Sequence, residues 1–336
     1  MLASGAANGV PSGQSSPALS FVNSATCYAN SSDLLGSYDD AEKFQKQVID
    51  GLNSYASNFT SDERSVIDGF KALYRANAEN ILLSRVGQVE LLLFAMGNLG
   101  GGDQTISIQL ALQHPFSQGR MYITTNDPFD YPALDPQCLS HWADVTLMRQ
   151  AVKLARKIAA TAPLKSVLGD EVSPGPTVTS DDAIDAFVAN GITTEFHPAN
   201  TLAMLPRSQG GVVDSRLRVY GLQNVRVVDA SVFPLQFAAH VSFHPSLCRN
   251  DTDFAQMQWP VYSLAEHASE FIRQFHNGVP DPDAPTNTGG DSSSNNTNTN
   301  NNNNNGGTTG GALSVATPSM LTSIVALFFA ALAVVL

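Results

Sequence analysis

The most informative part of the sequence is residues 195–243, which read EFHPANTLAMLPRSQGGVVDSRLRVYGLQNVRVVDASVFPLQFAAHVSF. Two histidines, His197 and His240, lie near the two ends of this segment. Between them, residues 217–220 and 225–228 are rich in β-forming side chains and flank the short turn GLQN, a pattern that predicts a pair of strands. The two histidines are therefore expected at the edges of one small sheet.

Polar residues of this segment are candidates for catalysis and for cofactor binding. Asp229 follows the second predicted strand, and ligands of open sheets bind beyond the carboxyl ends of strands. A turn-capping role is the alternative for this aspartate. Imidazole gives and takes protons near neutral pH, so His197 and His240 would suit removal of a proton from a hydroxyl group. Taken singly, each histidine could equally be structural.

Several classes of site are excluded by what the 336 residues lack. The formal net charge is −12, with 18 Lys+Arg against 30 Asp+Glu and no basic cluster, which excludes a nucleic-acid partner. No GxGxxG follows a predicted strand, and the sequence has no P-loop, no CxxC pair and no HExxH motif. It therefore predicts neither a self-contained phosphate cradle nor a metal site.

The rest of the ordered region mixes helices with strands. Apolar residues at helical spacing predict helices over residues 39–57, 61–83, 139–160, 180–190 and 260–276. Alternating residues predict strands over 106–112 and 120–125, and the Pro/Ser/Gly-containing loop between them suggests that the two strands pair.

The amino-acid sequence of several segments resembles the C-terminal region of the glucose-methanol-choline (GMC) family of FAD-dependent oxidoreductases. These segments are HPANT, GGVVDSRLRVYGLQNVRVVDASVFP, His240, VYSLAEHASEFI and, upstream, HPFSQGRMYITTNDPFDYPALDPQCL; VGQVELLLF is similar to the glucose-oxidase-like branch. The resemblance covers about residues 20–277. It implies an α/β (α+β) fold, in which a GMC-type substrate domain of antiparallel sheet and helices carries the C-terminal strands of an incomplete, Rossmann-like FAD-binding domain.

The resemblance also assigns roles to residues. His197 matches the general base that takes the substrate hydroxyl proton, His240 the second histidine on the same oxygen, and Glu90 the carboxylate that orients this second histidine. Asp229 and Ala230 match the segment that approaches the FAD ribityl and pyrophosphate groups, and Val241 matches a flavin-ring contact. The implied reaction is oxidation of a small alcohol or sugar at its CH–OH group, with hydride transfer to flavin N5.

Three departures from the family pattern accompany this resemblance. The N-terminal dinucleotide fold has no counterpart, so we expect this chain to be the C-terminal part of a longer enzyme, inactive alone. Asn200 stands where the HxGT pattern has glycine. Finally, Tyr262 lies 22 positions after His240, and we interpret residues 243–258 as a retained intron rather than an evolved loop.

The C-terminal end predicts attachment to a membrane. An Asn/Thr/Gly-rich stalk leads to MLTSIVALFFAALAVVL, residues 320–336, which fits a GPI signal better than a tail anchor. A GPI signal acts only on a secreted protein, yet the first residues of this sequence do not form a signal peptide. We therefore expect an N-terminal part of the protein to be missing from this chain. The sequons Asn30, Asn58, Asn250 and Asn295 suit a secreted glycoprotein.

The sequence thus predicts four parts, namely a substrate domain (1–194), a C-terminal GMC segment (195–277), a stalk (278–312) and a signal tail (313–336). The predicted function is that of an extracellular flavoenzyme held at the cell surface. The alternative is a GPI-anchored surface protein that keeps the GMC scaffold without catalysis. Substrate identity, oxidase or dehydrogenase behaviour and oligomeric state are left open.

Overall fold

The computed structural model describes residues 25–57, 61, 63–94, 106–237, 258–278 and 332–335. The chain divides into two compact units, 1–269 with 329–336 and 270–328. Of the second unit the structure describes only residues 270–278, which form the end of one helix and the turn after it. All remaining elements belong to the first unit.

The helices include all five that the sequence predicts and one short helix, α2, that it does not. They are α2 (Ser31–Leu35), α3 (Tyr38–Ser57), α4 (Arg64–Ala76), α5 (Trp142–Ala159), α6 (Asp181–Gly191) and α7 (Gln258–His276). A π-helical turn, η1 (Asn77–Ile81), continues α4, and 3-10 turns occur at η2 (Leu164–Ser166), η3 (Arg207–Gln209) and η4 (Ala230–Val232). Ser180 caps α6, because its hydroxyl accepts a hydrogen bond from the Ala183 amide at 3.2 Å.

The main sheet is antiparallel and has the strand order β1-β2-β3-β6. Its strands are β1 (Ala25–Ala29), β2 (Val89–Phe94), β3 (Ser107–Leu112) and β6 (Leu332–Val335), and a separate two-stranded sheet joins β4 (Arg120–Tyr122) to β5 (Ala133–Asp135). The register places Glu90 of β2 between Tyr28 of β1 and Ala111 of β3. Strand β2 is thus central.

One predicted strand pairing is wrong, and a second is shorter than predicted. Residues 106–112 and 120–125 do not pair with each other, because the amides of Phe116 and Ser117 donate to the Asp144 carboxylate and lead the chain away from the sheet. Residues 217–220 and 225–228 do pair, but only over a short length. Arg218 and Arg226 form an antiparallel bridge, the Val219 amide donates to the Val225 carbonyl, and the Val227 amide donates to the Leu217 carbonyl, both at 3.0 Å. Leu217 has φ +66°, which interrupts the extended backbone that a strand needs.

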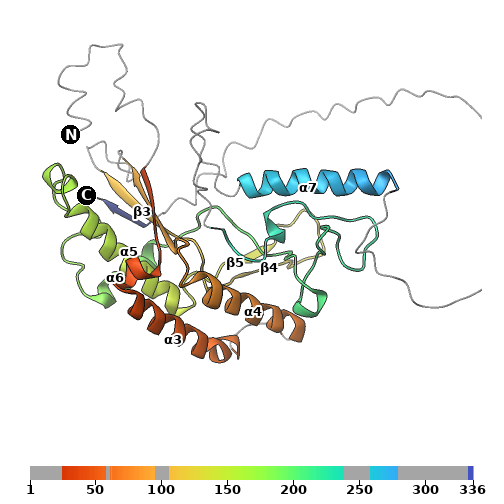
Figure 1. The fold of residues 1–336 in the computed structure, drawn as a ribbon, viewed down its shortest axis with the longest axis horizontal. Coiled ribbons are helices and arrows are strands. Elements are labelled where there is room, and N and C mark those ends of the chain that lie inside the picture. Colours follow the sequence, from red (N-terminus) through yellow and green to blue (C-terminus); the bar gives the residue numbers. More distant parts are fainter. Residues whose placement is uncertain are drawn as a thin grey trace, which may run out of the picture. The chain divides into compact units, whose positions relative to one another are not determined.

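The larger hydrophobic core lies between the sheet and the helices. Helix α5 contacts both β2 and β3, and it buries its apolar stripe against them (Figure 1). Fully buried members of this core include Val48, Val89, Leu147, Met148 and Val152. This core fixes the sheet on which Glu90 lies.

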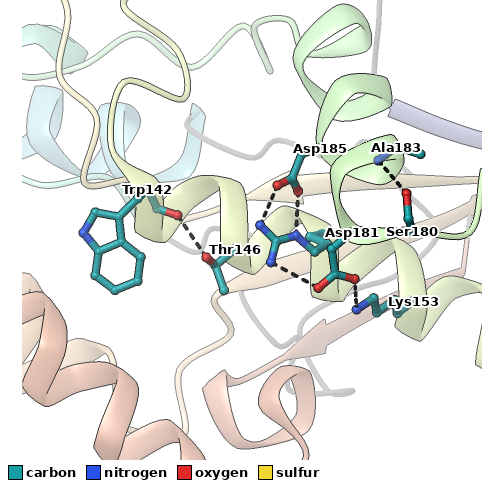
Figure 2. Close-up of polar contacts among 8 residues, drawn as sticks. Trp142, Thr146, Lys153, Ser180, Asp181, Ala183 and Asp185 are labelled. Carbon is teal, nitrogen blue, oxygen red and sulfur yellow. Dashed lines mark hydrogen bonds and ion pairs between the residues drawn. The ribbon is translucent and has the colours of Figure 1, made fainter.

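Ion pairs hold α6 on α5 at the edge of this core. The Arg149 guanidinium donates to both carboxylate oxygens of Asp185, at 2.6 and 2.5 Å, and also pairs with Asp181 at 3.5 Å (Figure 2). Lys153 donates to Asp181 from the next turn of α5, at 2.6 Å. Two-pronged pairing of this kind fixes the orientation of the two helices as well as their distance.

A second, smaller hydrophobic cluster is formed by residues that follow α6 in the sequence. Its buried members are Val213, Leu217, Val232, Phe233 and, from α7, Ala268. The turn η3 packs closely on α4, since a Cβ on Gly69 would lie 2.1 Å from the Gln209 carbonyl oxygen. Only glycine at position 69 permits this approach. The turn η3 is therefore held on α4, a helix of the larger core.

Among the residues that the structure describes, no helix is both long and apolar enough to cross a membrane. Of the predicted signal tail, the described residues are 332–335, which pair with β3 at its free edge.

Candidate active site

The loop that carries His197 runs beside the segment that carries Asp229. The Leu202 amide donates to the Ser231 carbonyl at 3.0 Å, and the Met204 amide donates to the Val232 carbonyl at 2.8 Å. Residues 197–204 and 229–236 therefore lie side by side, although some 30 positions separate them in sequence. His197 itself is half-buried.

The backbone of the His197 loop explains one departure from the family pattern. Asn200 has φ +74°, in the left-handed region that glycine enters without strain and that asparagine tolerates better than most other residues. Its side chain adds a contact that glycine cannot make, because Nδ2 donates to the Pro234 carbonyl at 2.6 Å. Asparagine at position 200 thus keeps the loop conformation and ties the loop to the neighbouring segment.

Asp229 begins the turn η4 and caps it. Its carboxylate accepts a hydrogen bond from the Ser231 amide at 2.8 Å and a second, short one from the Ser231 hydroxyl. This is the turn-capping role that the sequence left as an alternative. Asp229 is nevertheless exposed, while Ala230 after it is half-buried, so the carboxylate can also face a ligand.

Glu90 is the second residue of β2 and is only 1% exposed. The side-chain amide of Gln113, just after β3, donates to Glu90 Oε2 at 3.1 Å and to the Ala111 carbonyl at 3.3 Å. A buried carboxylate needs such hydrogen bonds, because burial without them is costly. Gln113 therefore belongs to the surroundings of Glu90.

A third histidine lies between Glu90 and the His197 loop. His114 follows Gln113 directly and is 5% exposed. Burial lowers the pKa of His114 to about 4, and a hydrogen bond with the Gln236 backbone acts in the opposite direction. The Gln236 side chain in turn donates to the His197 carbonyl at 3.1 Å. Contacts through Gln113, His114 and Gln236 thus connect the predicted orienting carboxylate with the predicted base.

The loop after β3 is held from the core side. The Asp144 carboxylate accepts hydrogen bonds from the Phe116 and Ser117 amides at 2.9 and 2.7 Å. In addition, Asn77 Nδ2 donates to the His114 carbonyl at 3.1 Å. Burial raises the pKa of Asp144 to about 6, although its hydrogen bonds oppose this shift. Nearby, His141 Nε2 lies 2.9 Å from the Tyr74 hydroxyl, and burial lowers the pKa of His141 to about 4.

His240 and Val241 lie outside the described residues, and so does all of the inserted segment 243–258 except Gln258. The structure places the His197 loop beside residues 229–236 and connects Glu90 to this loop indirectly, through Gln113, His114 and Gln236. The roles of all the predicted site residues stay predictions. Across the described ranges, no group of three or more His, Cys, Asp or Glu side chains could hold a metal ion.

Comparison with known proteins places these features in a family. Residues 115–245 match the family model described as GMC oxidoreductase. The GMC oxidoreductase family protein Mala s 12 of Malassezia sympodialis is 38% identical over 257 residues, which are 75% of this chain and 37% of that protein. Pyranose dehydrogenase 3 of Leucoagaricus meleagris is 36% identical over 157 residues, covering 46% of this chain and 24% of the relative.

Solved structures show the same fold. An FAD-dependent oxidoreductase from Chaetomium thermophilum superposes with a TM-score of 0.62 at 22% identity, over 80% of this chain and 41% of the other. A fungal aryl-alcohol oxidase gives a TM-score of 0.60 at 24% identity, over 78% and 40%. The predicted mixed α/β fold is thus confirmed.

The chain belongs to the GMC oxidoreductase family. It spans less than half the length of the relatives and solved structures named above. The branch within the family stays a prediction.

The pKa of His114 makes stability depend on pH. Unfolded His114 takes up a proton near its ordinary pKa of 6.5, whereas the folded protein resists protonation down to about 4. The free energy of unfolding therefore decreases as the pH falls from 6.5 to 4. One such group lowers it by about 1.4 kcal/mol per pH unit. His141 acts in the same direction. Asp144 acts oppositely, since its stabilising contribution is present below 3.8 and is lost as the pH rises through 6.

His114→Gln removes one of these histidines and leaves the other groups in place. We expect the slope of unfolding free energy against pH, measured by urea denaturation between pH 4.5 and 6, to become shallower by about 1.4 kcal/mol per pH unit. Equal slopes in the variant and the wild-type protein would mean that His114 titrates normally in the folded state.

Proposed function

We propose that this chain is the C-terminal part of a flavin-dependent oxidoreductase that acts on the CH–OH group of a small alcohol or sugar. The observation that carries the proposal is the connection of His197 to Glu90 through Gln236, His114 and Gln113. The names of the relatives give the substrate class, since they include a pyranose dehydrogenase and an aryl-alcohol oxidase.

The roles of the residues follow from their chemistry. His197 takes the proton of the substrate hydroxyl, and His240 donates a hydrogen bond to the same oxygen as negative charge develops on it. Glu90 orients His240, as the resemblance to the glucose-oxidase-like branch implies. When bound, FAD supplies the acceptor for the hydride that leaves the carbinol carbon.

The described residues fit part of an FAD site. The exposed Asp229 carboxylate accepts hydrogen bonds, which suits the ribityl hydroxyls, and Ala230 offers a small side chain beside it. Val241 is proposed as the contact to the flavin ring. The sequence has no glycine-rich phosphate cradle, so the remaining part of the protein must provide it. We therefore expect weak or no FAD binding by this chain alone.

The domain organisation and the location of the protein belong to the same proposal. A substrate domain (1–194) and a C-terminal GMC segment (195–277) form the enzyme part, the stalk (278–312) spaces it from the membrane, and the tail (313–336) is exchanged for a GPI anchor. The charge-free composition of residues 320–336 supports the last assignment.

We expect the complete protein to be coloured by bound flavin, and the reduction of this flavin by substrate to depend on His197. In the protein with its N-terminal part restored, His197→Ala should keep the flavin absorbance but slow substrate-dependent flavin reduction by about 10²–10⁴-fold. His276→Ala, a change of an exposed histidine at the end of α7, is the matched control and should reduce at the wild-type rate.

Anaerobic stopped-flow absorbance with an aryl alcohol and a pyranose measures the flavin absorbance and the rate of flavin reduction. Unchanged reduction in His197→Ala would mean that the base is misassigned. A folded, complete protein without flavin absorbance would contradict the enzyme proposal and favour the non-catalytic surface protein.

The anchor is tested on cells that express the complete protein. We expect phosphatidylinositol-specific phospholipase C to release it into the medium, and deletion of residues 320–336 to give a secreted form without enzyme treatment. Immunoblots of cell and medium fractions measure the release. Retention on the membrane after phospholipase treatment, with removal only by detergent, would instead show a tail anchor.

A further inference from the structure

Two side-chain amides connect the His197 loop to its neighbour in opposite directions. Asn200 Nδ2 donates from the loop to the Pro234 carbonyl at 2.6 Å, and Gln236 Nε2 donates back to the His197 carbonyl at 3.1 Å. We call this reciprocal pair, Asn200 and Gln236, the amide clasp. All four residues are half-buried, where hydrogen bonds are less exposed to competition from water.

The clasp fixes both ends of the short stretch from His197 to Asn200. This stretch has no helix or strand of its own among the described elements. It is also bounded by two residues in the left-handed region, Phe196 with φ +60° and Asn200 with φ +74°. Such conformations of non-glycine residues persist only where surrounding contacts hold them.

Backbone hydrogen bonds continue these contacts beyond Asn200. The amides of Leu202 and Met204, which are C-terminal to Asn200, donate to the neighbouring segment. The Gln236 side chain adds a contact at the His197 carbonyl, N-terminal to these backbone hydrogen bonds.

We propose that Asn200 and Gln236 are positioning residues, which hold the backbone of His197 at the distance and angle that its imidazole needs. The effect on catalysis rests on the proposed function, whereas the effect on the loop does not. A glycine at position 200 would accept the left-handed backbone and lose the clasp, so Asn200 is more than a substitute for glycine.

Amide hydrogen exchange of the full 336-residue chain tests the effect on the loop. Asn200→Gly removes the donor without introducing backbone strain, and Gln236→Glu keeps the side-chain size but removes the donor. We expect the Leu202 and Met204 amides to exchange at least about tenfold faster in both variants. Amides in the middle of α5, such as that of Ala151, should keep their wild-type protection.

Gln45→Glu is the matched control. It removes a similar side-chain amide contact, from Gln45 Nε2 to the Ala78 carbonyl at 2.7 Å, far along the sequence from the loop. It should leave exchange at Leu202 and Met204 unchanged. Wild-type exchange at these amides in Asn200→Gly and Gln236→Glu would overturn the clasp, and so would equal acceleration in α5, since that shows a loss of global stability.

Kinetics of the complete enzyme test the effect on His197. In Asn200→Gly, the rate of flavin reduction at saturating substrate should fall about tenfold or more, while KM changes less than about threefold and the flavin spectrum stays the same. A wild-type rate would overturn the positioning role. If the wild-type protein itself does not reduce flavin, the proposed function fails, and the exchange experiment still decides the clasp.

Discussion

Hydrogen bonds from the amides of Leu202 and Met204 to the carbonyls of Ser231 and Val232 hold two irregular segments side by side. These segments carry His197 and Asp229, the base and the cofactor residue that we propose. Neither segment has enough regular structure to keep its shape alone. The second hydrophobic cluster includes residues of both segments, and the turn η3, which lies between them in sequence, packs on α4 at Gly69.

The helices and their ends could be predicted from sequence, because their signals are local. The apolar stripe of α5 and the Ser180 cap of α6 depend on residues within a few positions of each other. Strand pairing could not be predicted equally well. Asp144 redirects the chain after β3 from 28 positions away, and the positive φ of Leu217 is invisible in a run of β-forming residues.

The candidate site shows the same limit. His197 and Glu90 were identified through the family resemblance, since no local pattern distinguishes a catalytic histidine or glutamate from a structural one. Gln236 and His114 were missed because their partners are distant in sequence; 39 positions separate Gln236 from His197. The available signal was the polar pair Gln113-His114 at the end of the alternating run 106–112, where a strand leaves the sheet.

We propose that the His197 loop and the Asp229 segment together form the substrate side of a flavin site. A crystal structure of the complete protein with FAD and an alcohol or sugar analogue would test this arrangement. We expect the His197 imidazole within hydrogen-bond distance, about 2.6–3.2 Å, of the analogue's hydroxyl oxygen, with FAD against residues 229–231. A flavin bound elsewhere, or an imidazole that points away from the analogue, would contradict it.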